Sequence, residues 1–174
     1  MSPDWRKILR PGRIDLGRRR LLGGLAAATG LAGLSATSGA RAQGDASELK
    51  FPGEEPDHKV VYQFNKADQA YHEHVLFSVG AMVRKYGDNI GIVVVAFGPG
   101  IHILGKNPER PVSEETKQRV SSLNQYGVEF HACGNTMRSL GWIKEDLVPF
   151  AQVVEVGAAD LMELQEQGYA YLSW

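Results

Sequence analysis

The run NIGIVVVAFG, residues 89–98, is the stretch of this chain that decides the fold. It is almost entirely apolar and rich in β-branched residues, and it lacks the alternation of polar and apolar side chains that a half-exposed strand shows. A strand of a parallel sheet has this composition when helices bury both of its faces. The run therefore predicts a central strand of an α/β sheet.

Further strand and helix patterns alternate on both sides of this run. Strands separated by helices of about ten residues form right-handed βαβ units, so we expect an α/β fold with a mainly parallel sheet of about five strands covered by helices. The predicted elements are a strand at 59–64, a helix at 67–87, the strand at 89–98, a Gly/Pro-punctuated segment in which a short strand at 101–104 can form, a helix opened by Ser113 and ended by Gly127, a strand at 128–133, a short helix at about 135–147 that breaks near Gly141, a strand at 151–157, a helix at 158–168 and a strand at 169–174.

The first 42 residues have the features of an export signal. Arginines at 18–20 precede an apolar stretch of Leu, Ala and Gly, and the segment closes with an A-x-A-like cleavage site at 40–42. Paired arginines followed by two leucines resemble the twin-arginine variant of the bacterial signal. The apolar stretch is Gly-rich and shorter than the roughly 18 residues that span a bilayer. We expect cleavage after Ala42 and a periplasmic protein without stable membrane association, the alternative being an uncleaved anchor.

The remaining chain divides into an arm and one domain. Residues 43–57 are polar and interrupted by Pro and Gly, which predicts a flexible linker or arm before a domain at 58–174. Residues 1–42 hold eight of the basic and two of the acidic residues, which leaves 11 basic and 18 acidic ones and a net charge near −7. No basic stripe remains to neutralise phosphates, so nucleic-acid binding is disfavoured.

Cys133 is the only cysteine, so the chain has no internal disulfide. It ends the predicted strand at 128–133 and precedes a short helix, and ligands bind beyond such strand ends in parallel sheets. A helix N-terminus favours the thiolate, the reactive form of the side chain. Gly134 allows close backbone approach, and Asn135 or Thr136 can cap the helix, so the three together suit a small anion beside the sulfur.

Strand alternation puts Glu129, His131 and Cys133 on one face of the strand. Alternate residues lie about 6.6 Å apart, so His131 can influence the thiol without hydrogen-bonding to it. A different interpretation remains open, because free cysteine is among the most buried residue types and usually behaves as a small hydrophobe. Cys133 is therefore either the reactive atom or inert core.

The histidines allow a second kind of site. His102 and His131 lie at or near strand ends, and imidazoles with one thiolate can bind zinc or copper. His72 and His74, however, fall near the start of a helix and point about 200° apart, so they do not share one ion. The chain has no C-x-x-C, H-E-x-x-H, G-x-S-x-G or phosphate-loop motif, and we predict no metal and no cofactor.

Three segments together resemble the DsrE/DsrF family of small sulfur-relay proteins, in particular an exported branch with the YchN-like fold. They are IVVVAFGPGIHIL (92–104), LNQYGVEFHACGNTM (123–137) and VEVGAADLMELQEQGYAYLSW (154–174), in the order that the family has them. The resemblance covers essentially all of residues 59–174.

The resemblance implies a three-layer α/β/α domain that forms a homotrimer or homohexamer. It also implies a cysteine that accepts sulfane sulfur as a persulfide and passes it to a partner protein. Cys133 matches that position. We therefore expect Cys133 and His131 to carry the chemistry, with Gly134, Asn135, Thr136 and His102 binding the ligand. The alternative is a non-catalytic oligomer that binds a small ligand or metal and has an inert buried cysteine.

Overall fold

The computed structural model describes residues 55–174. The predicted export signal (1–42) and all but the last three residues of the predicted arm (43–57) lie outside the described residues. The described elements, with η for 3-10 helices, are β1 (His58–Phe64), α1 (Gln69–Tyr86), η2 (Gly87–Asn89), β2 (Ile90–Ala96), η3 (Gly98–Leu104), α2 (Glu114–Gln125), β3 (Glu129–Cys133), α3 (Gly134–Leu140), η4 (Lys144–Asp146), β4 (Gln152–Val154), α4 (Gly157–Glu166) and β5 (Ala170–Leu172).

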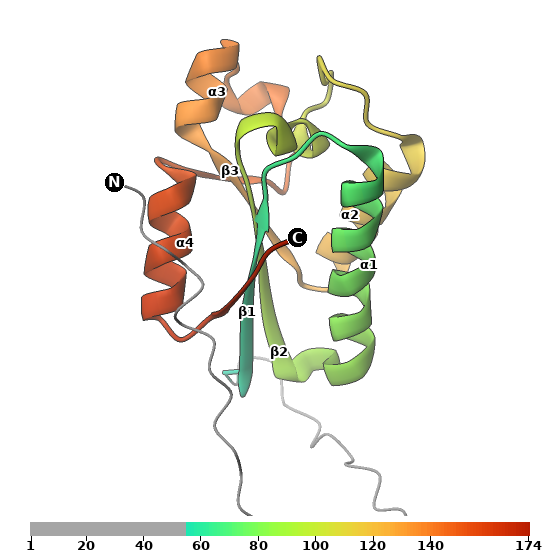
Figure 1. Ribbon diagram of the computed structural model, residues 1–174, viewed down its shortest axis with the longest axis vertical. Helices are drawn as coiled ribbons and strands as arrows, with labels where there is room; N and C mark the ends of the chain where they lie inside the picture. The colour runs from blue at the N-terminus through green and yellow to red at the C-terminus, as the bar shows by residue number, and fades with distance from the viewer. Residues whose placement is uncertain (1–54) are drawn as a thin grey trace, which may run out of the picture. The chain divides into compact units, whose positions relative to one another are not determined.

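The five strands form one sheet in the order β4-β3-β2-β1-β5, and every neighbouring pair is parallel. Helices α1 and α2 cover one face of the sheet, and α4 covers the other (Figure 1). This arrangement confirms the predicted α/β class with helical layers on both faces of a parallel sheet. Within the described part of the chain, no helix has both the length and the hydropathy needed to cross a membrane.

Burial on both faces explains the composition of β2. Val94 belongs to the larger core cluster, which the sheet forms with α1 and α2. Val93 and Val95 point the other way and pack with Leu161 and Leu164 of α4. Alternate residues of the strand thus enter two different cores, and both cores require apolar side chains. The strand therefore needs apolar residues at consecutive positions.

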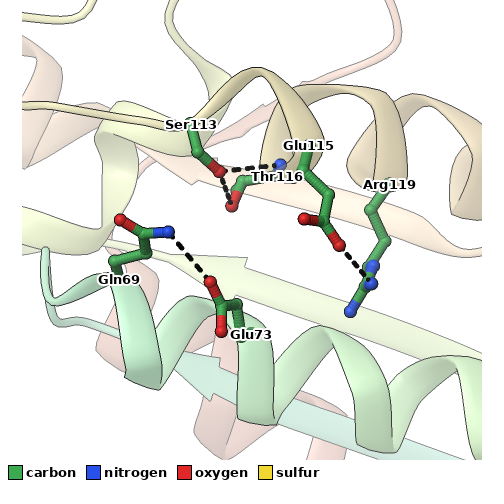
Figure 2. A network of polar contacts seen from close by, with 6 residues as sticks. All are labelled: Gln69, Glu73, Ser113, Glu115, Thr116 and Arg119. Atoms are coloured by element: carbon green, nitrogen blue, oxygen red, sulfur yellow. Dashed lines mark hydrogen bonds and ion pairs between the residues drawn. The ribbon is translucent and has the colours of Figure 1, made fainter.

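The start of α2 is fixed by a side-chain cap that the sequence indicates. Ser113 Oγ accepts a hydrogen bond from the Thr116 amide at 3.1 Å, which satisfies one of the unpaired N–H groups of the first turn. One turn further on, Glu115 and Arg119 form an ion pair at 2.8 Å. Figure 2 shows these contacts beside the first turns of α1.

The segment after β2 differs from the expectation of a short strand at 101–104, because the structure has the 3-10 helix η3 there. The chain turns at Gly98, whose φ is +50°, and the Gly100 amide donates to the Phe97 carbonyl at 3.1 Å. A Cβ on Gly100 would lie 2.4 Å from the Phe64 carbonyl oxygen. The backbone therefore packs directly on the end of β1, where a helical turn fits and an extended strand does not.

The short helix expected at about 135–147 breaks as predicted. Helix α3 ends at Gly141, which has φ +68° and donates through its amide to the Arg138 carbonyl at 3.2 Å. After this left-handed residue the chain forms only the single turn η4. Glycine suits the end of a helix because a positive φ costs it little.

Candidate functional site

Cys133 lies where the carboxyl ends of three neighbouring strands meet. It is the last residue of β3 and pairs with Val154, the last residue of β4. On the other side, Ala132 pairs with Ala96 at the end of β2. The side chain is buried, with 5% of its surface exposed. The thiol therefore sits inside the edge of the sheet at which parallel α/β folds bind ligands.

Two helices begin at this thiol. Cys133 is itself the N-cap of α3, and its Sγ accepts a hydrogen bond of 3.2 Å from the amide of Gly157, the first residue of α4. A Cβ on Gly157 would lie 3.1 Å from Cys133 Cβ and 3.3 Å from Phe97 Cβ. Only glycine lets α4 approach closely enough to direct its first amide at the sulfur.

The hydrogen bonds around the sulfur favour the thiolate. Burial acts to raise the pKa of the Cys133 thiol, but donation from the Gly157 amide, from the amide and hydroxyl of Thr136, and from the Asn135 amide outweighs it, so the pKa lies below its usual value. A thiolate is the nucleophilic form of cysteine, and a lowered pKa makes more of it available at neutral pH. This buried cysteine is therefore chemically distinct from a core thiol in apolar surroundings.

Gly134 has the close contacts that the sequence indicates. A Cβ there would lie 3.1 Å from the carbonyl oxygen of Val154 and 3.3 Å from that of Glu155. The amide of the next residue, Asn135, donates to the Glu155 carbonyl at 3.2 Å. The start of α3 is thus packed against the end of β4, which fixes the backbone beside the sulfur.

The expected capping role of Asn135 or Thr136 is wrong. Helix α3 begins one residue earlier, at Gly134, with Cys133 as N-cap and no side-chain cap. Thr136 Oγ1 instead accepts a hydrogen bond from the Gly98 amide at 3.0 Å. This hydroxyl therefore connects the loop after β2 with the first turn of α3, and it also hydrogen-bonds to the thiol of Cys133.

His131 is on the predicted face of β3, but its bonding partner is a carboxylate. Its Nδ1 lies 2.8 Å from Asp160 Oδ2 in α4, and its buried Nε2 has no hydrogen-bond partner and lies 3.6 Å from Glu129 Oε2. The groups that set the pKa of Cys133 do not include His131. His131 is thus held to α4 by its ring, in the layer that also supplies the Gly157 amide.

His102 lies on the other side of Thr136, in η3. Its ring is 3% exposed, packs edge-on against Trp142 at 5.2 Å, and has no hydrogen-bond partner at Nδ1. A buried polar atom without a partner costs about 1–3 kcal/mol. The ring borders a surface hollow of about 350 Å³, whose lining residues are Gly98, Pro99, His102, Arg110, Asn135, Thr136, Ser139 and Leu140.

The remaining histidines do not form a metal centre. His72 is buried and its Nε2 bonds to the Lys66 carbonyl at 3.0 Å, while His74 is exposed. Among residues 55–174, no three His, Cys, Asp or Glu side chains are grouped so that they can hold a metal ion.

Gly157 and Asp160, which contact Cys133 and His131, were not anticipated from the sequence. Gly157 stands between a strand and a helix in VEVGAAD, and a glycine at such a junction is a signal for close backbone approach to a ligand or side chain. Asp160 gives no comparable signal, because its contact with His131 joins residues that are 29 positions apart.

A family model described as the DsrE/DsrF-like family matches residues 51–174. The chain belongs to this family. The match covers more than two thirds of the sequence and includes the whole site around Cys133. The resemblance inferred from the three sequence segments is thereby confirmed at the level of the family.

Solved structures agree with this assignment of the DsrE/DsrF-like chain. A protein of unknown function from Methanobacterium thermoautotrophicum is 28% identical, with a TM-score of 0.61, and the match covers 68% of this chain and all of that one. The ychN protein from E. coli is 11% identical, with a TM-score of 0.52 over 67% of this chain and 99% of that one, and shows the fold alone. No curated protein matches the chain.

Proposed function

We propose that this DsrE/DsrF-like protein carries sulfane sulfur as a persulfide on Cys133. The observation that carries the proposal is the 3.2 Å hydrogen bond from the Gly157 amide to Sγ, at the start of a helix and with the thiol pKa lowered. A persulfide is an anion at neutral pH, and the same amides and helix end that favour a thiolate favour it. The family resemblance points to the same chemistry.

The reaction needs no external oxidant. The Cys133 thiolate attacks the outer sulfur of a donor R–S–SH, a new S–S bond forms, the donor S–S bond breaks, and R–S⁻ leaves with the electron pair. Unloading is the same reaction with Cys133 as the leaving group. An acceptor thiolate attacks the outer sulfur of Cys133–S–SH and releases the Cys133 thiolate. Both steps follow the rules of thiol–disulfide exchange.

The surrounding residues have separate parts in this proposal. Gly134 gives the backbone its close approach, and Asn135 and Thr136 donate to the sulfur. His131 lies on the same strand face and is held by Asp160, so its ring joins β3 to α4, the helix whose first amide donates to the sulfur. Because the chain has a single cysteine, the sulfur must leave to another molecule and cannot be resolved as an internal disulfide.

Export and assembly belong to the same proposal. The twin-arginine pattern at 18–22 and the A-x-A-like site at 40–42 support a periplasmic location, and the family resemblance supports a homotrimer or homohexamer. Fractionation of cells, N-terminal sequencing of the exported protein and its mass in solution test these points. Retention in the cytoplasm of a variant with lysines at 18–20 would support the twin-arginine route, and unchanged export would refute it.

The test of the sulfur carrier is intact mass spectrometry of the native protein after incubation with polysulfide. We expect a gain of one sulfur atom that dithiothreitol removes, and no gain in Cys133→Ser, which has no thiol. Equal sulfur gain in the variant, or none in the native protein, would overturn the proposal.

The deep burial of Cys133 favours one other candidate, an oligomeric small-ligand or metal-binding module with an inert cysteine. This candidate predicts that iodoacetamide labels Cys133 only after unfolding, and that metal analysis of protein purified without a His tag detects any stoichiometric ion. If iodoacetamide labels the native protein, and the rate rises with pH around a midpoint below the ordinary pKa of a thiol, Cys133 is not inert.

A further inference from the structure

The hollow beside His102 is built to receive an anion. Among its lining residues Arg110 is a permanent cation, and none is an aspartate or glutamate. Guanidinium groups form strong, directional hydrogen bonds with carboxylates and related oxyanions. The charge of the hollow therefore selects a ligand with negatively charged oxygen atoms.

Among its other polar side chains, Asn135 supplies a donor, whereas the hydroxyls of Thr136 and Ser139 already form hydrogen bonds within the protein. The side-chain oxygen of Asn135 accepts from Arg138, which leaves its NH₂ group free to donate to a ligand. His102 is 3% exposed and forms part of the wall of the hollow. Pro99 and Leu140 supply apolar wall for a short carbon chain.

The hollow and the thiol share two residues. Thr136 and Asn135 line the hollow, and both also donate toward Cys133 Sγ. A molecule bound in the hollow thus touches residues that also bond to the sulfur. At about 350 Å³ the hollow has the size of a small-molecule site.

We propose that this hollow binds the anionic end of a low-molecular-weight persulfide, a small thiol persulfide with a carboxylate or sulfonate group, and presents its outer sulfur to Cys133. The inference rests on the proposed carrier function and names its donor. Arg110 holds the anionic group, and the side-chain NH₂ of Asn135 donates beside it. Movement of Thr136 opens the way to the buried thiol.

The transfer itself balances without a further reactant. The Cys133 thiolate attacks the outer sulfur of ⁻OOC–R–S–SH, Cys133–S–SH forms, and the carboxylated thiolate ⁻OOC–R–S⁻ leaves with the electron pair of the broken S–S bond. The anionic product then competes with fresh donor for the hollow.

The experiment compares three donors of similar size by the concentration that gives half-maximal loading of Cys133, followed by mass spectrometry. They are the persulfides of 3-mercaptopropionate, 2-mercaptoethanesulfonate and 2-mercaptoethanol, of which the last is uncharged at its far end. We expect the charged donors to load at lower concentration and Arg110→Ala to raise that concentration roughly five- to tenfold for them alone. A preference between the two charged donors identifies which anionic group the hollow takes.

Arg84→Ala is the matched control, because it removes one exposed arginine from α1, outside the lining of the hollow. A second measurement uses S-methylated 3-mercaptopropionate, which cannot donate sulfur and should compete with the charged donors in the native protein but not in Arg110→Ala. This competition does not require a His102 variant, which carries the risk of misfolding.

The outcomes separate the two proposals. If all three donors load at equal concentrations, or if Arg84→Ala weakens loading as much as Arg110→Ala, the anion site is refuted and the carrier function stands. If no donor and no polysulfide loads the native thiol, the carrier function fails and the donor site fails with it.

Discussion

Replacing Gly157 by alanine tests the contact on which the candidate site depends. The added methyl group would lie 3.1 Å from Cys133 Cβ and 3.3 Å from Phe97 Cβ, closer than the roughly 3.5–4.0 Å of favourable carbon contacts. The start of α4 must therefore move away by several tenths of an ångström. That movement lengthens and bends the amide-to-sulfur bond, now 3.2 Å.

The size of the effect follows from the bond that is weakened. Hydrogen bonds to charged groups contribute about 1.5–3 kcal/mol, and sulfur accepts weakly, so a loss of about 1.4 kcal/mol is a reasonable expectation, which is a factor of about ten in the ionisation equilibrium. Gly157→Ala should therefore weaken the acidity of the thiol about tenfold, which raises its pKa. The assay is the alkylation rate with iodoacetamide as a function of pH, whose midpoint reports the pKa independently of access to the thiol.

Gly80→Ala is the control for this variant. Gly80 lies within α1, and a Cβ there would make only ordinary contacts, 3.4 Å to Arg84 and 4.0 Å to Leu123. The midpoint should be unchanged in this control. If the midpoint is also unchanged in a folded Gly157→Ala protein, the α4 amide does not hold the thiolate and the reasoning is refuted.

Three further predictions concern stability. Ser113→Ala should lower the free energy of unfolding in urea by about 1 kcal/mol through loss of the α2 cap, and Ser113→Asp should restore most of it; equal loss in both would exclude the cap. Gly100→Ala should cost about 1–3 kcal/mol or more, because its Cβ would lie 2.4 Å from the Phe64 carbonyl oxygen, and an unchanged melting temperature would contradict this packing. Burial lowers the pKa of His72 and of His102, and a nearby arginine lowers that of His102 further. As pH falls below the ordinary value of 6.5, the unfolded chain takes up protons before the folded one, so the free energy of unfolding falls progressively toward the lowered pKa of each histidine. Urea unfolding at about pH 7.5 and 5.5 measures this change, and a larger free energy of unfolding at pH 5.5 would contradict it.

The fold was predictable because its strongest constraint is local. A strand buried on both faces must be apolar at consecutive positions, and residues 89–98 satisfy this without reference to any other segment. The strand predicted at 101–104 was wrong because the prediction also used only the local composition. Its residues are all buried, and a buried 3-10 turn and a buried strand have the same composition, so only the contact of Gly100 with the end of β1 decides between them.

The candidate site was predictable only in part. Cys133 and Gly134 could be recognised as site residues because they lie at the end of a predicted strand, which is visible in the local sequence. The Asp160 carboxylate and the Arg110 side chain come from other elements than β3, and their positions at the site depend on how α4 and the loop after η3 pack. No residue pattern within one segment contains that information.

The pairing of β1 with β5 has a consequence for the timing of biosynthesis. Val60 aligns with Ala170, 110 positions later, so one side of β1 lacks its neighbour until nearly all of the described chain has been translated. During elongation the open backbone edge of β1 is a template for strands of other nascent chains. A chaperone that shields this edge, or slow initiation that spaces ribosomes along the message, would reduce such pairing between nascent chains.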